Sequence, residues 1–352
     1  MNKVHGHKIT TFSMCLIISL LAVLDNGAAA DVSTSQRETD FFQPQINPHR
    51  PLSLLPDSLD LMHIQRAGIR FRRPIVAAPD LLSAKKAESV TSCVQKGRLL
   101  FVTGTLLSAN YYAYHRFKDM WWNYPRTRLH LYRGWRQTEG WYDFGPHDSL
   151  WHHMDKLGHF YNTRLLSLLL SDTAAWIGFA NSTSQWIGAV MSWLFYLQIE
   201  IYDGQFEQWG FSLGDLAANT AGAFMPLLQQ HSRFLQKFTL KWSYFPSEIQ
   251  QQKYVVEDYA GMTFWLTTNP QEFLPRFFDP FWPDFLNVAL GYSVTKKTLG
   301  DIELFFGLDY DLTKIATHSL FWNRVLFYLN FLHLPAPAIR FRPTQQFFLL
   351  YY

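Results

Sequence analysis

Cysteine is scarce in this chain, which has only Cys15 and Cys93 among 352 residues. Cys15 lies in an amino-terminal segment that we expect to be removed, so Cys93 is expected to be the one cysteine of the mature protein. A single cysteine excludes an intramolecular disulfide framework and a cysteine-rich metal site. We therefore expect the core to be held together without covalent cross-links.

A strong excess of charge of one sign is also missing. The formal net charge is only +3, and the Lys and Arg residues are scattered, so nucleic acid is not expected as a partner. Aromatic residues are abundant instead, at 17% of the chain, the same share as the charged residues. This composition favours contact with apolar surroundings, and we expect a membrane or another envelope component as partner.

The amino terminus lacks an apolar run long enough to span a membrane. The run from Phe12 to Leu24 follows two lysines and precedes the small residues Ala28, Ala29 and Ala30. This order is typical of a signal peptide over residues 1–30. Because Cys15 stands at the start of the run, we predict cleavage near Ala30 without lipid attachment. The protein is then exported to the periplasm or to a cell-envelope membrane, either inner or outer.

The rest of the chain divides into three parts. Residues 31–93 contain many prolines and are expected to be an extended or disordered lead-in. Residues 94–269 read as a helical core domain. Its expected helices cover residues 94–116, 152–180, 185–206 and a segment from Ser212, followed by two more joined at Pro246.

The stretch His152–Tyr161, HHMDKLGHFY, carries an unusual set of polar side chains. On a helix, His152, Asp155 and His159 are three and four residues apart and share one stripe. The preceding Asp148 or Ser149 is the expected N-cap, since either side chain can accept the free backbone N–H groups of a first turn.

Two more polar patches follow on the next two helices. Glu200 and Asp203 lie on one face near the end of an apolar helix, and Asp215 and Asn219 lie one turn apart after Ser212, the expected cap. Small residues around Gly222 predict close packing with a neighbouring helix. Because lone charges are costly in apolar surroundings, we expect the three patches to meet.

A change of period marks residues 270–352. Residues 286–294 and 302–312 alternate apolar and other side chains, which predicts a β-hairpin, followed by a helix over 314–331 and extended segments. The predicted fold class is therefore mainly α. It is a helical bundle with a polar cluster between apolar helices, plus a small C-terminal section that contains a β-hairpin and packs on the core.

Residues 121–222 contain a three-part pattern in a fixed order: Asp-Lys-x-x-His, then Glu-x-x-Asp, then Ser-x-x-Asp-x-x-x-Asn-x-x-Gly. This pattern resembles the YfiM-like family of predicted periplasmic lipoproteins, whose function is not established, and more distantly the VanZ-like membrane proteins. The resemblance singles out the following residues: Asp155, Lys156, His159, Glu200, Asp203, Ser212, Asp215, Asn219 and Gly222. The expected lipid-attachment cysteine is missing.

Three roles remain open for these residues. In a structural network or binding site, Asp155 would bond His159 or Asn219, Lys156 would neutralise Glu200, and Asp215 would complete the ring. In a metal-dependent hydrolase of an envelope lipid, glycan or phosphoester, a divalent metal would activate water. Its ligands would be His152, Asp155, His159, Glu200 and Asp203. Without metal, His159 would act as a general base oriented by Asp155.

Overall fold

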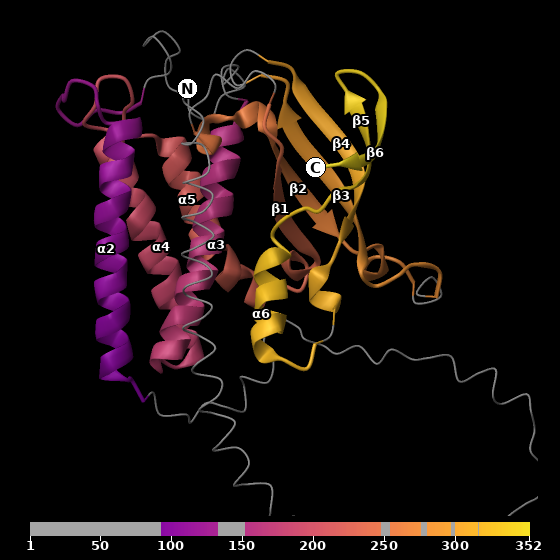
Figure 1. Ribbon diagram of the computed structural model, residues 1–352, viewed down its shortest axis with the longest axis horizontal. Helices are drawn as coiled ribbons and strands as arrows, with labels where there is room; N and C mark the ends of the chain where they lie inside the picture. Colours follow the sequence, from indigo (N-terminus) through magenta and orange to yellow (C-terminus); the bar gives the residue numbers. More distant parts are fainter. Residues whose placement is uncertain (1–92, 133–151, 248–253, 276–279, 297–299, 316) are drawn as a thin grey trace, which may run out of the picture.

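The computed structural model describes residues 93–132, 152–247, 254–275, 280–296, 300–315 and 317–352. The predicted signal peptide and the predicted lead-in up to residue 92 lie outside them. Four long helices form one layer, and an antiparallel sheet lies beside it (Figure 1). The helices are α2 (Lys96–Met120), α3 (Met154–Ile177), α4 (Asn181–Asp203), α5 (Leu213–His231) and the shorter α6 (Leu320–Leu329). In Figure 1, α2 lies at the outer edge of the layer and α3 lies next to the sheet.

Glycines allow α3 to pack tightly against α4 and α5. A Cβ atom on Gly222 would come within 2.3 Å of the Phe160 carbonyl oxygen, and one on Gly188 within 2.4 Å of the Ser167 carbonyl oxygen. Hydrogen bonds cross the same contacts, since the Ser167 hydroxyl donates to the Ala223 carbonyl at 2.8 Å. The close approach predicted from the small residues around Gly222 is confirmed.

We expect Gly222→Ala to lower the free energy of unfolding by about 1–3 kcal/mol, because the added methyl group must push α3 and α5 apart. Gly104 in α2 is the matched control, because a Cβ atom there would meet nothing within 4 Å. Gly104→Ala should therefore stabilise the helix by about 0.5–1 kcal/mol. Urea unfolding measures both values. Equal effects of the same sign would contradict the tight contact.

The sheet contains six strands in sequence order, each antiparallel to the next. They are β1 (Phe238–Tyr244), β2 (Met262–Thr268), β3 (Leu286–Val294), β4 (Ile302–Tyr310), β5 (Ala336–Arg342) and β6 (Gln346–Tyr351). The sheet curls so far that the segment before β5 returns to β1. There, Trp242 N donates to the Phe331 carbonyl and His333 N donates to the Trp242 carbonyl, each at 2.9 Å.

The concave side of this curled sheet holds polar side chains. Lys241 and Asp309 are both fully buried there, with Lys241 Nζ 2.8 Å from Asp309 Oδ2. Lys241 Nζ also donates to the Asn330 side chain at 2.9 Å. Trp265 fills the centre and stacks on His333, with ring centroids 4.0 Å apart. The interior thus combines a buried ion pair with an aromatic cluster in which Phe305 and Tyr351 also contact Trp265.

The convex side of the sheet is apolar, and the helices cover part of it. Met262, Phe264 and Val294 pack against Met154, Tyr161 and Leu169 of α3, and against α6. An ion pair also connects α3 to α6, because Asp172 of α3 lies 3.0 Å from Arg324 of α6. The helical layer and the sheet therefore share one core.

The predicted fold class is wrong. The chain is not a mainly α bundle with a small β-hairpin, because the described residues contain five α-helices and a substantial six-stranded sheet. The predicted hairpin is present as β3 and β4, but it is only the centre of this sheet. The two helices expected on either side of Pro246 are instead β1 and β2, and the described part of the chain before β2 contains two short 3₁₀ helices, Val255–Glu257 and Tyr259–Gly261.

Among the described residues, no helix is long and apolar enough to cross a membrane.

Candidate functional site

The polar site begins on the first turns of α3. This helix starts at Met154, and His152 and His153 before it have left-handed backbones with φ of 50° and 59°. The predicted start at Asp148 or Ser149 is therefore wrong, and those two residues lie outside the described part of the chain. Because His152 precedes the helix, it does not share the stripe of Asp155 and His159. Its Nε2 lies 2.6 Å from the Gly300 carbonyl oxygen instead.

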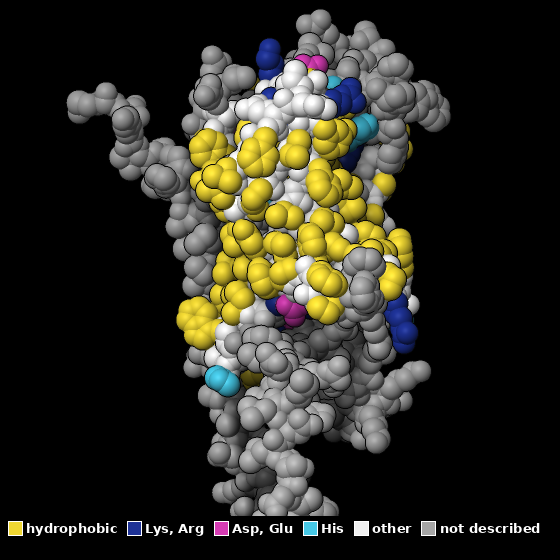
Figure 2. All heavy atoms as spheres, turned by 90° about the vertical axis from the view of Figure 1, so that its right-hand side faces the viewer, with side chains coloured by type: hydrophobic (Ala, Val, Ile, Leu, Met, Phe, Trp, Pro, Cys, Tyr) yellow, Lys and Arg dark blue, Asp and Glu magenta, His cyan; other side chains and the backbone are white. Residues whose placement is uncertain are grey.

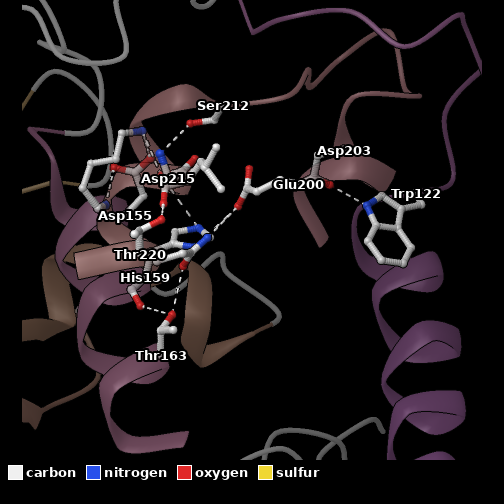
Figure 3. Close-up of polar contacts among 12 residues, drawn as sticks. Trp122, Asp155, His159, Thr163, Glu200, Asp203, Ser212, Asp215 and Thr220 are labelled. Carbon is white, nitrogen blue, oxygen red and sulfur yellow. Dashed lines mark hydrogen bonds and ion pairs between the residues drawn. The ribbon is translucent and has the colours of Figure 1, made fainter. Parts of the chain in front are cut away.

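His159 lies at the centre of the site, where α3, α4 and α5 meet (Figure 3). Its Nδ1 is 3.0 Å from Asn219 Oδ1, and because an amide oxygen only accepts, this bond places a proton on Nδ1. The same Nδ1 is 3.7 Å from Glu200 Oε1. On the other side of the ring, Nε2 faces Asp215 Oδ1 at 3.8 Å. One histidine thus contacts side chains of two neighbouring helices.

Lys156 carries the positive charge of the site. Its Nζ lies 2.8 Å from Asp155 Oδ2 and 3.1 Å from Asp215 Oδ1, so it bridges α3 and α5. This pairing differs from the one expected, in which Lys156 would neutralise Glu200. Ser212 is the N-cap of α5, as predicted, because its hydroxyl accepts a hydrogen bond from Asp215 N at 2.9 Å.

Glu200 is almost completely buried, with 1% of the residue exposed. Its Oε1 accepts a hydrogen bond from the Asn219 amide at 3.2 Å. Burial, followed by the nearby charges of Asp215 and Asp203, raises the pKa of Glu200 to about 10. The carboxyl group is therefore neutral at pH 7, and Asn219 joins a neutral acid to a histidine.

Asp203 points away from this centre towards α2 (Figure 3). Its Oδ1 accepts a hydrogen bond from Trp122 Nε1 at 2.5 Å. Burial raises the pKa of Asp203 to about 7, against the lowering effect of this hydrogen bond. Trp122 is itself buried among aromatic rings of α2 and α4. Asp203 therefore fixes Trp122, just beyond the end of α2, to α4, and it acts on Glu200 and His159 through its charge without a hydrogen bond to either among the described residues.

Two contributors were missed by sequence reasoning. Thr163 lies one turn after His159, and its hydroxyl is 3.0 Å from Asn219 Oδ1, so its i+4 spacing was an available signal. Tyr259 lies close enough to Asp155, Lys156 and Asp215 for their charges to act on its hydroxyl. It comes from a short 3₁₀ segment before β2, and no local pattern places that segment here.

Three of these side chains could hold a metal ion. Among the described residues, one ligand atom each of His159, Glu200 and Asp215 lie within 4.8 Å of one another. Of the five ligands predicted for a metal, only His159 and Glu200 fall in this group. His152 and Asp203 point elsewhere, and Asp155 pairs with Lys156.

Comparison with known proteins covers the part of the chain that builds this site. No curated protein and no solved structure matches the chain. Residues 138–231 match the model of a family described as predicted periplasmic lipoprotein (DUF2279). That segment contains α3, α4 and α5, but neither α2 nor the sheet.

The match does not confirm the finer YfiM-like and VanZ-like resemblances. Its description includes a lipid anchor, whereas we predicted none, and residues 1–30 lie outside the described part of the chain. The expected localisation is supported. Over α3, α4 and α5 the chain is thus similar to an uncharacterised family of predicted periplasmic lipoproteins, as fits an exported protein of the periplasm or the envelope membrane.

Proposed function

We propose that this exported envelope protein acts by binding rather than by catalysis, and that its polar cluster is a structural network that holds α3, α4 and α5 together. One observation carries the proposal: most groups of the cluster find their partners within it. Lys156 lies between Asp155 and Asp215, and Asn219 lies between His159 and Glu200. A polar network of this kind specifies how helices pack.

The charges support the same role. With Glu200 neutral, the two carboxylates that face Lys156 are those of Asp155 and Asp215. The Lys156 ammonium group lies beside both of them, and His159 donates from Nδ1 to Asn219 while its Nε2 faces Asp215. The cluster thus places its cation between its two less buried carboxylates and keeps the buried carboxyl group neutral.

A divalent metal site is the second candidate, and it would fit a hydrolase of an envelope lipid, glycan or phosphoester. The specific observation is the convergence of His159, Glu200 and Asp215, in which Nε2 of His159 faces Asp215 Oδ1. That oxygen is buried and accepts no hydrogen bond from the described residues, although the Lys156 ammonium group lies 3.1 Å from it. A metal would require Glu200 to be ionised, because carboxylates bind metals in their charged form.

Glu200→Gln separates the two candidates. If the network is structural, glutamine keeps a neutral oxygen for Asn219, and the free energy of unfolding near pH 4.5, where about half of the Glu200 carboxyl groups are still protonated in the unfolded chain, should change by less than about 1 kcal/mol. If Glu200 is a metal ligand, the wild type should contain near-stoichiometric metal by elemental analysis and the variant should lose it while staying folded. Asp203→Asn is the matched control, because Asp203 lies outside the three-residue group and should not affect metal content.

Glu200→Gln should also change how the free energy of unfolding depends on pH. The folded-state pKa of Glu200 is raised from 4.5 to about 10, so the folded protein holds this proton more tightly than the unfolded chain. Its stabilising contribution is therefore complete below about pH 4.5 and is lost as pH rises towards 10, with a slope of at most about 1.4 kcal/mol per pH unit. Glu200→Gln should remove this decline. A wild type and variant with parallel stability curves from pH 5 to 9 would contradict the neutral carboxyl group.

A further inference from the structure

The convex side of the sheet carries an apolar strip that no described segment covers. The strip consists of Leu266, Leu290, Phe306, Ile339 and Phe347, which are directly opposite one another on β2 to β6. Their exposed fractions are 43%, 54%, 47%, 47% and 64%. Figure 2 shows a broad hydrophobic area on this side of the molecule. At about 4.8 Å per strand, the strip is about 19 Å long.

The sheet is inverted relative to a sheet that faces water. An antiparallel sheet with one solvated face normally directs its polar side chains to that face. Here the alternation directs the charged Lys241, Asp309 and Glu303 to the concave interior, beside the buried Trp265 and Phe305, while the open convex side carries exposed apolar residues. A monomer in water rarely exposes an apolar surface of this extent unless the surface binds something.

We propose that this strip lies against the surface of a lipid bilayer, with the strands parallel to the membrane plane and the apolar side chains inserted among the acyl chains. A bilayer would be the partner in the binding role proposed above, and this proposal rests on that role. The protein is exported to the envelope, where a bilayer is close by. The connection between β2 and β3 carries two more exposed aromatic side chains, Phe281 and Phe285, and aromatic rings favour the headgroup level.

The shape of the surface favours lipid over a second copy of this chain. The strip lies on the outside of a curled sheet, so two copies would touch along a narrow line and leave much of each strip exposed. Lipid chains adapt to a convex surface. The ends of the strands carry exposed charges of both signs, namely Lys296, Arg342 and Lys314 together with Asp284 and Asp301. Binding should therefore depend mainly on apolar insertion, and only weakly on anionic lipid.

The test is co-sedimentation of the full-length chain with vesicles of phosphatidylcholine, alone or with one-quarter phosphatidylglycerol. The sheet variant combines Leu290→Ser, Phe306→Ser and Ile339→Ser. The matched control combines Leu100→Ser, Leu107→Ser and Tyr111→Ser on α2, where exposure is 74%, 66% and 68%. We expect the sheet variant to lower the partition coefficient more than tenfold on both vesicles and the control less than threefold. Any other membrane anchor in the chain would be present in both variants, so it would not change the difference between them.

Equal binding of the two variants would overturn the proposal. So would a wild type that ignores vesicles but forms a dimer that the sheet variant abolishes, because the strip would then bind a second copy. If the sheet variant does not fold, a labelling experiment decides the question. An environment-sensitive fluorophore is attached at Leu290→Cys or, as the control, at Leu107→Cys. Both variants are made in a chain whose Cys15 and Cys93 have been replaced. Lipid should shift the emission at position 290 to the blue and leave position 107 unchanged. None of these outcomes affects the Glu200→Gln test of the cluster.

Discussion

Lys241→Met is expected to lower the free energy of unfolding by about 3–5 kcal/mol, enough to prevent many single domains from accumulating. The substitution leaves Asp309 buried at 0% exposure without its cation, and of the described residues only Asn287 still donates a hydrogen bond to its side chain, at 3.2 Å. Burial lowers the pKa of Lys241 and raises that of Asp309, and each charge opposes the effect of burial on the other. Urea unfolding followed by tryptophan fluorescence gives the stability difference.

The double variant Lys241→Met/Asp309→Leu is the control for this prediction. Replacing both charges with apolar side chains of similar size removes the unpaired charge, and such replacements are often neutral or stabilising. We therefore expect the double variant to recover much of the stability lost in the single variant. A double variant as unstable as Lys241→Met would mean that the damage comes from lost packing.

Asn219→Leu should be the most damaging single change in the polar cluster, with a loss of about 2–4 kcal/mol. The side chain is fully buried, and its amide serves both Glu200 and His159. Leucine has a similar size but no polar atoms, so it leaves both neighbours without this partner, and each unpaired buried group costs about 1–3 kcal/mol. The abundance of the variant in cells should fall together with its stability.

Thr220→Val on the same helix is the comparison for Asn219→Leu. Thr220 is exposed and bonds Trp193 at 3.0 Å, so its loss should cost less than about 1 kcal/mol. An Asn219→Leu protein that is as stable as the wild type would count against the structural network and in favour of a site held for chemistry.

Local chemistry explains which parts of the site were predictable. Ser212 caps α5 because its hydroxyl reaches a backbone N–H three residues away, a contact that the sequence already contains. The positions of Asp155, Lys156 and His159 on one helix, and of Asp215 and Asn219 on another, follow from helical spacing. Their pairings did not follow. Lys156 pairs with Asp215 and leaves Glu200 to Asn219, and which of these side chains meet depends on how α3, α4 and α5 pack against one another.

The sheet was underestimated because its defining contacts join distant segments. β3 and β4 alternate strictly and are joined by a short connection, so they were recognisable. β1 reads FTLKWSY, and the buried Lys241 in its middle resembles a residue on the polar face of a helix. Only the pairing of β1 with β2 and with residues 331–333 identifies it as a strand. Propensity within a short window does not contain that information.

The closure of the sheet has a consequence for the order of folding. Lys241 bonds Asn330, 89 residues further along the chain, and β1 meets residues 331–333 only when the last part of the chain is present. Contacts between such distant residues form slowly, because a large loop must first be ordered. The helices, whose partners are closer in sequence, can form earlier. During export, one edge of β1 therefore stays unpaired and Lys241 stays exposed until the carboxyl terminus has crossed the membrane. We expect the protein to be most prone to aggregation and proteolysis in that interval.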